Sequence, residues 1–288
     1  MLDKLSVLIP TRNRPKVLEE AFKQMYQHGL GDLYYLIYDD ASDDPQLTVE
    51  ACSQICNVTI LKGKTRVGQA QGRNILLREC ATPYAVLMDD DTWFTETSSL
   101  NDLIERDLFY QDIGRATAVC SQVFRTTDGV TIFPENASTK RILSPLGMGC
   151  IVRKDDILRV GGFRSFFQYR HEETELGLRL WEQDLPVVYD PSLVIAHSHS
   201  DLARSSPEYD RLSARNLILM HALNLPGAAG LPLGIARALR LLLIPGVFRF
   251  AVVKGMVNGI QSTIHYRSEA TVMSKKSYWE LRQFLRQA

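Results

Sequence analysis

Three consecutive carboxylates follow an apolar run and offer the clearest chemistry in the sequence. The run is Tyr84-Ala-Val-Leu-Met88, and Asp89, Asp90 and Asp91 follow it directly. Such a run is typical of a strand buried on both faces, and open α/β sheets bind ligands at the carboxyl ends of their strands. If the chain stays extended, Asp89 and Asp91 point to one side and Asp90 to the other. The spacing then predicts that Asp89 and Asp91 hold Mg²⁺ or Mn²⁺ for a phosphate, with a solvated acidic turn as the alternative.

An alternation of strand-like and helix-like segments must position these carboxylates. Strand-like segments at 5–9, 33–38, 58–61 and 84–88 are separated by helix-like segments at 15–28, 46–53 and 68–79. This order predicts a parallel sheet covered by helices, with right-handed crossovers. The loops that follow the strands then meet at one edge of the sheet. These loops contain residues 11–14, 39–44, 62–66 and 89–91, which are rich in charged and polar side chains.

The second half of the chain predicts a more mixed arrangement on the same sheet. Shorter strand candidates lie at 116–121, 130–133 and 148–152, followed by Gly161-Gly162-Phe163. A helix is expected from Glu172 to Glu182, because acids open it and a base lies near its end. Short strands at 187–189 and 193–196 then lead to two histidines, His197 and His199. We expect an α/β domain at residues 1–200, with halves at 1–112 and 113–200, and a helical region at 201–288.

Charge and cysteine content exclude several classes of protein. The sequence has 33 basic and 33 acidic residues and a net charge of zero, whereas binding to a nucleic-acid backbone needs an excess of Lys and Arg. The five cysteines are scattered, which indicates reduced thiols in a cytosolic protein. Cys52 and Cys56 lie four apart on an expected helix, but no second Cys or His pair accompanies them at zinc spacing. The first apolar stretch is too short for a secretion signal.

The C-terminal region is apolar and basic. No Asp or Glu occurs from Arg211 to Ser268, while that segment contains Arg211, Arg215, Arg237, Arg240, Arg249, Lys254 and Arg267. Residues 217–236 carry no charge, but two prolines and several glycines interrupt them, so one helix spanning a bilayer fits poorly. Helices that lie on an anionic membrane surface fit the composition better. A helical appendage packed on the α/β domain is the alternative.

The motifs occur in an order that resembles family 2 of the glycosyltransferases. The resemblance covers residues 5–200 and implies the GT-A fold, an α/β architecture in which a mostly parallel sheet is flanked by helices. It also implies transfer of a sugar from a nucleotide donor. The motifs that carry it are Val7-Leu-Ile-Pro-Thr-Arg-Asn-Arg14, Asp39-Asp40-Ala-Ser-Asp43, Gly68 with Arg73-Asn74, Asp89-Asp90-Asp91, Gly161-Gly162-Phe163 and Glu172-Glu173-Thr-Glu-Leu-Gly-Leu-Arg179. The tail, with Arg215-Asn216 and residues 254–259, looks like bacterial members that build envelope polysaccharides, including rhamnosyltransferase-like ones.

The resemblance implies a nucleoside site at the ends of the first two strands. A carboxylate there can accept from a uracil or thymine imide N–H, although guanine also offers donors. Asp39 is the adjacent option to Asp40, and capping of turns is the alternative role of residues 39–44. The residues implied are Pro10, Thr11, Arg12 and Asp40.

The phosphates and the metal are implied to lie beside the acid cluster. Arg66 and Arg73 could bind phosphate as bidentate donors, although either also suits a solvated helix face. Gly162 lets the backbone approach the donor, and Asp90 and Asp89 complete the donor side. The metal motif maps onto Asp89 and Asp91, with Asp91 as the more direct ligand. His197 stands where the family often has a histidine near the metal; His199 competes with it, and a surface imidazole is the alternative.

The catalytic base is implied to come from Glu172 and Glu173, where the family usually has Glu-Asp. Helical spacing places Glu173 on one face with Leu176 and Leu180, and Glu172 on another with Arg179. We therefore expect Glu173 to point inward and take the proton of the acceptor hydroxyl in one inverting displacement. Glu172 remains open as the base, and both acids could instead only favour the helix N-terminus.

The resemblance favours an inverting, metal-dependent glycosyltransferase at the inner face of the cytoplasmic membrane. Residues 1–112 would bind a nucleotide sugar, with UDP or dTDP favoured, and residues 113–200 a glycan or lipid-linked acceptor. A membrane-associated nucleotide-sugar binding module without catalysis is one alternative. A sugar-phosphate nucleotidyltransferase is another, but it should follow its first strand with a glycine-rich loop, whereas this chain has Pro10-Thr-Arg-Asn-Arg-Pro15.

Overall fold

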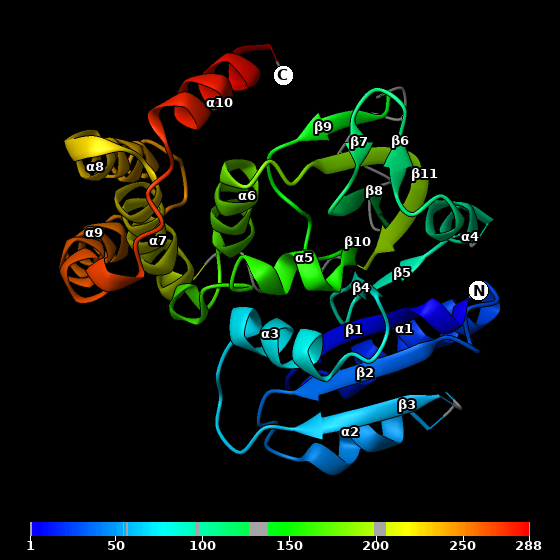
Figure 1. Cartoon of the computed structure of the whole chain (residues 1–288). Helices are drawn as coiled ribbons and strands as arrows, with labels where there is room; N and C mark the ends of the chain where they lie inside the picture. Colours follow the sequence, from blue (N-terminus) through cyan, green and yellow to red (C-terminus); the bar gives the residue numbers. More distant parts are fainter. Residues whose placement is uncertain are drawn as a thin grey trace. The chain divides into compact units, whose positions relative to one another are not determined.

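The structure is a computed structural model that describes residues 2–53, 55, 57–95, 98–126, 138–198 and 206–287 (Figure 1). The chain divides into two units. The first comprises Met1–Gln168 and Leu185–His199, and the second comprises Tyr169–Asp184 and Ser200–Ala288. The segment that contains the expected helix from Glu172 therefore groups with the C-terminal helices. The sequence had placed it with the α/β part.

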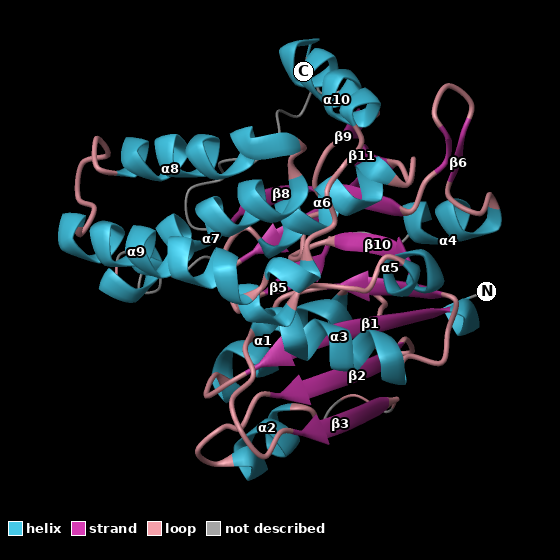
Figure 2. Ribbon diagram, turned by 60° about the vertical axis from the view of Figure 1, so that its left-hand side comes forward, coloured by secondary structure: helices cyan, strands magenta, loops and turns pink. Residues whose placement is uncertain are grey.

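The first unit is built on a mixed β-sheet (Figure 2). Its strands are β1 (Leu5–Thr11), β2 (Tyr34–Asp39), β3 (Val58–Lys62), β4 (Tyr84–Leu87), β5 (Thr92–Phe94), β8 (Ala118–Arg125), β9 (Lys140–Ile142), β10 (Cys150–Arg153) and β11 (Val187–His197). In the described part of the chain their order is β3-β2-β1-β4-β10-β8-β11-β5, with β9 paired to β11. Strands β1 to β4 are parallel, as the sequence predicts, and β10 runs antiparallel to β4. The mixed second half is therefore confirmed.

Helices cover both faces of this sheet. They are α1 (Pro15–Gln27), α2 (Pro45–Ala51), α3 (Gln69–Glu79), α4 (Ser98–Glu105) and α5 (Lys154–Arg159), with 3₁₀ turns η1 (Leu2–Lys4) and η2 (Ser165–Phe167) and a separate hairpin of β6 (Phe109–Tyr110) and β7 (Gly114–Arg115). Helices α1 and α2 both begin with a proline, whose fixed φ suits the first helical position. Asp44 caps α2 by accepting from the Gln46 amide. These start signals agree with the predicted helices.

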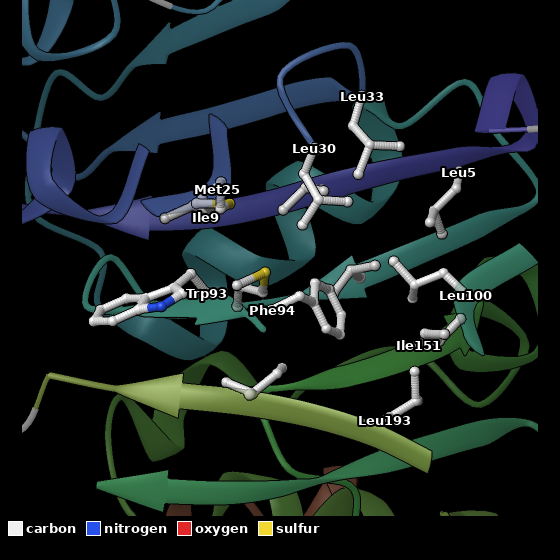
Figure 3. Packing of buried hydrophobic residues seen from close by; sticks show 14 of the residues in the cluster. Leu5, Ile9, Met25, Leu30, Leu33, Trp93, Phe94, Leu100, Ile151 and Leu193 are labelled. Atoms are coloured by element: carbon white, nitrogen blue, oxygen red, sulfur yellow. The ribbon is translucent and has the colours of Figure 1, made fainter. Parts of the chain in front are cut away.

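The main core lies between the sheet and helices α1, α2 and α4 (Figure 3). Alternate β1 residues, including Leu5 and Ile9, contribute to this core, as the period of a strand requires. Burial of each such side chain stabilises the fold by about 1.5 to 3 kcal/mol. Trp93, which follows the acid cluster by two residues, also belongs to this core. Cys52 also packs there, while Cys56 lies outside the described residues.

Strand β11 differs from its prediction. We expected two short strands at 187–189 and 193–196, but one strand runs from Val187 to His197. Its register against β8 shifts between Asp190 and Val194. Pro191 lies within this shift, and a bulge is where a strand tolerates a proline that has no amide to donate. The expected strand at 130–133 lies outside the described residues.

The second unit is helical. Its helices are α6 (Glu172–Glu182), α7 (Pro207–Asn224), α8 (Gly230–Leu241), α9 (Arg249–His265) and α10 (Lys275–Gln287), with 3₁₀ turns η4 (Gly227–Ala229) and η5 (Arg267–Glu269). Helix α7 packs against both α8 and α9 (Figures 1 and 2). Glycines permit this approach, because a Cβ at Gly255 would lie 2.2 Å from the Arg211 carbonyl oxygen and one at Gly234 would lie 2.8 Å from the Ile218 Cα. Within the described residues, no helix has both the length and the apolar character needed to cross a bilayer.

Candidate active site

Arg14 joins two of the three clustered carboxylates. Its guanidinium donates to Asp90 and, 2.8 Å away, to Asp91 Oδ2. The expected alternation, with Asp90 opposite Asp91, is therefore wrong. The chain turns after β4, since the Thr92 amide donates to the Asp89 carbonyl oxygen at 3.3 Å, and alternation applies only to extended backbone. Sequence reasoning did not assign Arg14 a role, although it lies in the first-loop motif that carries the family resemblance.

The environments of Asp90 and Asp91 push their pKa values apart. Burial raises the pKa of Asp90 to about 7, although the charge of Arg14 opposes this rise. Thr11 Oγ1 donates to Asp90 Oδ2 at 2.7 Å and fixes the carboxyl group in place. Burial also raises the pKa of Asp91, but hydrogen bonding to His197 and the charge of Arg14 outweigh it, so the net shift is downward. Asp91 is therefore ionised at neutral pH, as a metal ligand must be.

Strand β11 places His197 beside this cluster. His197 is the last residue of β11 and pairs with Thr92 of β5. Its Nε2 atom lies 3.3 Å from Asp91 Oδ1, and the Ser198 amide donates to the Asp91 carbonyl oxygen at 2.8 Å. The predicted proximity of His197 to the acid cluster is thus present in the structure. The competing His199 lies outside the described residues.

The Asp91 and His197 side chains fit a divalent cation by the chemistry of their donor atoms. A carboxylate oxygen and an imidazole nitrogen suit Mn²⁺, and an ion on a diphosphate keeps phosphate oxygens and waters as its other ligands. The described part of the chain has no group of three or more His, Cys, Asp or Glu side chains arranged to hold a metal.

Asp89 turns toward helix α3. Its Oδ1 atom accepts from Gln69 Nε2 at 2.7 Å and from the Arg73 guanidinium at 2.9 Å. The Arg73 side chain is only 1 % exposed and lies over the Phe163 ring, 5.6 Å from its centroid. Asp89 thus links the acid turn to α3. Metal binding by Asp89 and phosphate binding by Arg73 stay predictions.

The acids at the end of β2 organise loops. Both oxygens of Asp39 are used within the segment that leads to α2, because Oδ1 accepts from the Ser42 amide at 2.7 Å and Oδ2 from the Thr48 hydroxyl at 2.6 Å. Asp40 accepts from the amides of Val67 and Gly68, at 2.6 and 2.9 Å. The turn-capping role weighed for residues 39–44 is therefore present at Asp39. Asp40 instead ties the loop after β3 to the end of β2.

The other expected donor residues border the same loops. Pro10 lies at the end of β1, and its Cβ atom would be 3.4 Å from a Cβ at Gly72 of α3. One guanidinium nitrogen of Arg12 lies 3.8 Å from Asp43 Oδ1, a distance typical of a weak surface ion pair. Arg66 is exposed in the loop after β3. These positions agree with the expected edge of the sheet, while contacts with a nucleotide stay predictions.

Gly162 has a structural requirement that the sequence only suggested. Its φ is +68°, and a Cβ there would lie 2.5 Å from Asn74 Oδ1. The Asn74 side chain forms two hydrogen bonds with the backbone of Phe163, the residue after Gly162. It donates to the Phe163 carbonyl oxygen at 2.6 Å and accepts from the Phe163 amide at 2.8 Å. Asn74 therefore holds the Gly161-Gly162-Phe163 segment against α3. Asn74 belongs to a motif that carries the family resemblance, but the sequence alone indicates no role for it.

In the second unit, α6 has buried residues both on the face with Leu176 and Leu180 and on the face with Glu172 and Arg179. Glu173 is expected to point inward, but Glu172 on the other face is only 3 % exposed, and Arg179 pairs with the buried Glu175 through Nη2 and Oε2, 2.7 Å apart. Helix α7 packs on α6. Glu173 is half-buried. The burial of the two side chains therefore does not show which of Glu172 and Glu173 is the base, and the role of either stays a prediction.

The segment before α6 is held in an unusual conformation. Arg170 and His171 have φ values of +77° and +64°, which side-chain-bearing residues rarely adopt. Asn216 of α7 donates to the carbonyl oxygens of Tyr169 and Arg170, at 2.9 and 2.8 Å. Burial, and then the charge of Arg170, lowers the pKa of His171 to about 4. Strained backbone of this kind is concentrated at functional sites.

Comparisons with known proteins agree on one family. Residues 6–171 match the family model described as Glycosyl transferase family 2, which is more than half of the 288 residues. An uncharacterized glycosyltransferase of Haemophilus influenzae is 23% identical over 222 residues, covering 74% of each chain. GalNAc-T7 in complex with UDP, GalNAc and Mn²⁺ has a TM-score of 0.60 at 12% identity, covering 77% of this chain and 48% of that one.

A second solved structure covers almost the whole chain. The mannosyltransferase PcManGT from Pyrobaculum calidifontis, in complex with GDP-Man and Mn²⁺, has a TM-score of 0.57 at 16% identity, over 99% of this chain and 80% of that one. The chain spans about half the length of GalNAc-T7. At these identities the solved structures show a shared fold, and the family model shows membership. The chain therefore belongs to glycosyltransferase family 2 and has the GT-A fold, followed by a C-terminal helical region.

Proposed function

We propose that this protein is an inverting glycosyltransferase that uses a nucleoside diphosphate sugar, with UDP or dTDP as the favoured nucleotide. Its acceptor would be a hydroxyl of a glycan or of a lipid-linked saccharide, with transfer at the inner face of the cytoplasmic membrane. The observation that carries the proposal is that Asp91 contacts both Arg14 and His197. These three residues lie at or just after the ends of β4, β1 and β11. Two structurally similar proteins form complexes with Mn²⁺ and either UDP or GDP-Man, which supports the donor class.

The donor side of the mechanism follows from the acid cluster. Asp91 and His197 would hold a divalent ion on the diphosphate. When bound, such an ion supplies positive charge that stabilises the departing nucleoside diphosphate. Arg14 keeps Asp91 ionised and oriented. Thr11 and Arg14 fix the position of the Asp90 carboxyl group.

The acceptor side requires a base. Glu173 would accept the proton of the acceptor hydroxyl while that oxygen attacks the anomeric carbon, with Glu172 as the other candidate. The C–O bond to the acceptor forms as the bond to the diphosphate oxygen breaks, and one displacement inverts the anomeric configuration. The first turn of α6 suits a carboxylate, because helix N-termini stabilise negative charge.

A donor-turnover assay tests this proposal. The purified protein is incubated with UDP-, dTDP- and GDP-sugars and Mn²⁺, and release of nucleoside diphosphate and of free or transferred sugar is followed by NMR. We expect turnover with one nucleotide class, with an inverted anomer as the first product. Glu173→Gln should lower turnover at least 100-fold, while the exposed Glu280→Gln on α10 serves as the matched control. Nucleotide binding without turnover in the wild type would instead favour a non-catalytic binding module.

A further inference from the structure

Helix α9 presents a row of apolar side chains to solvent. The row consists of Phe250, Val253, Val257, Ile260 and Ile264, all of which are exposed. Phe250 and Ile264, near its two ends, are 84 % and 75 % exposed. Their spacing alternates between three and four residues, so they occupy an arc of about 80° on a helix with about 3.6 residues per turn. A continuous apolar row of this kind is unusual on the surface of a monomeric protein and marks an interaction site.

The opposite side of α9 explains why the large side chains face outward. Ala251, Val252, Gly255 and Gly259 are the buried residues of this helix. A Cβ at Gly259 would lie 3.0 Å from the Arg215 carbonyl oxygen, so α7 packs against bare backbone there. Small residues thus occupy the inward face, and the larger apolar ones remain outside. This is the reverse of the usual order for a helix that only packs on a domain.

The segment that leads into α9 adds to the exposed apolar surface. Leu243 is 82 % exposed, and Ile244 and Phe248 are also exposed. The Phe248 amide donates to the buried Asp210 of α7 at 2.8 Å, which fixes the start of α9 relative to α7. The row and this segment together form what we call the α9 surface. It consists of Leu243, Ile244, Phe248, Phe250, Val253, Val257, Ile260 and Ile264.

The charged side chains of α9 itself are all basic, and the exposed Glu208 of α7 is paired with Arg211. On the helical wheel Arg249 falls on one side of the row and Lys254 on the other, about 20° and 40° beyond its edges. Both side chains are exposed, as are Arg237 and Arg240 of the preceding helix α8. The sequence has no acid from Arg211 to Ser268 to balance them. A second copy of the same surface would bring like charges together, whereas an anionic surface would complement them.

We propose that the α9 surface binds the face of an anionic lipid bilayer. The apolar row would enter the boundary between headgroups and acyl chains, while Arg249 and Lys254 would remain among the phosphates. The 17 residues of α9 span about 25 Å, so the helix would lie in the plane of the interface and not cross it. This inference rests on the proposed function for the identity of the membrane, and it names the surface that makes the contact.

Vesicle flotation tests the proposal directly with the full-length protein. Vesicles of phosphatidylcholine alone are compared with vesicles that contain one third phosphatidylglycerol. We expect wild-type protein to float with the anionic vesicles at low salt and less with the neutral ones. Phe250→Ser and Ile264→Ser should each weaken binding about tenfold. Phe109→Ser, which removes an exposed aromatic ring from β6 of the first unit, is the matched control and should stay within about twofold.

Variants that remove a positive charge provide an independent test of the proposal. Arg249→Gln and Lys254→Gln should each weaken binding to anionic vesicles about fivefold, and neither should alter binding to neutral ones. Wild-type protein that fails to bind anionic vesicles, or Phe250→Ser that binds as wild type does, would overturn the proposal. A dimer in light scattering that Phe250→Ser dissociates, without vesicle binding, would assign the surface to a second copy. Nucleotide-induced thermal stabilisation, measured on the same samples, shows separately whether the donor site is functional.

Discussion

Replacing Asp90 by asparagine tests the electrostatic account of the acid cluster. Burial raises the pKa of this carboxyl group to about 7 in the folded protein, whereas an Asp in an unfolded chain titrates at about pH 3.9. Between these two values the folded state holds a proton that the unfolded state has released. Stability that is present at low pH is therefore lost as the pH rises through the folded-state pKa.

The size of the effect follows from the two pKa values. One pKa unit corresponds to about 1.4 kcal/mol. Integrating the difference in bound protons between pH 5 and pH 8 gives a loss of about 2.5 kcal/mol for the wild type. Asp90→Asn has no proton to lose at this position. Its free energy of unfolding, relative to wild type, should therefore rise by about 2.5 kcal/mol over the same pH range.

Urea-induced unfolding, followed by circular dichroism at several pH values from 5 to 8, measures this difference. Asp91→Asn is the matched control. The pKa of Asp91 is lowered in the folded state, because His197 and Arg14 outweigh the effect of burial. Its contribution to stability is thus present throughout this range and is lost only at lower pH. A pH-independent difference between wild type and Asp90→Asn would refute the reasoning that burial keeps Asp90 protonated.

Four further substitutions probe the rest of the site. Gly162→Ala places a Cβ against Asn74 at a φ of +68°, and we expect a loss of about 1 to 3 kcal/mol in the free energy of unfolding; an unchanged thermal melt would contradict the close approach. His197→Gln should weaken Mn²⁺-dependent nucleotide binding at least tenfold while leaving the metal-independent part unchanged, which calorimetric titration with and without EDTA measures. Glu172→Gln and Glu173→Gln, compared in single-turnover transfer, should differ by at least 100-fold in rate, and equal losses would contradict a single base.

The framework of the first unit could be predicted from local sequence. Four apolar runs of strand length alternate with helical segments, and the runs that form β1, β2 and β4 are largely buried while β3 is partly buried. The parallel direction of the strands alone is enough to predict at which edge of the sheet the loops meet. The resemblance to family 2 was likewise readable, because six motifs occur in order along the chain. These features depend on residues close together in sequence.

Features that depend on distant contacts were not predictable. The bond from Arg14 to both Asp90 and Asp91 requires a turn after β4 and contact between residues 76 and 77 positions apart. Helix α7 packs on α6 but begins more than twenty residues after it, so no local pattern encodes this packing. The continuity of β11 through Pro191 depends on its pairing with β8. In each case the deciding partner is remote in sequence.

The most direct test of the donor site is the metal dependence of nucleotide binding. Thermal stabilisation is measured with UDP, dTDP and GDP, each with Mn²⁺, Mg²⁺ or EDTA, for wild type, Asp91→Asn and Glu173→Gln. The account predicts stabilisation by one nucleotide that needs the metal, is lost in Asp91→Asn and survives in Glu173→Gln. Equal stabilisation of Asp91→Asn and wild type, or no nucleotide binding under any condition, would contradict the assignment of this acid cluster as the metal-dependent donor site.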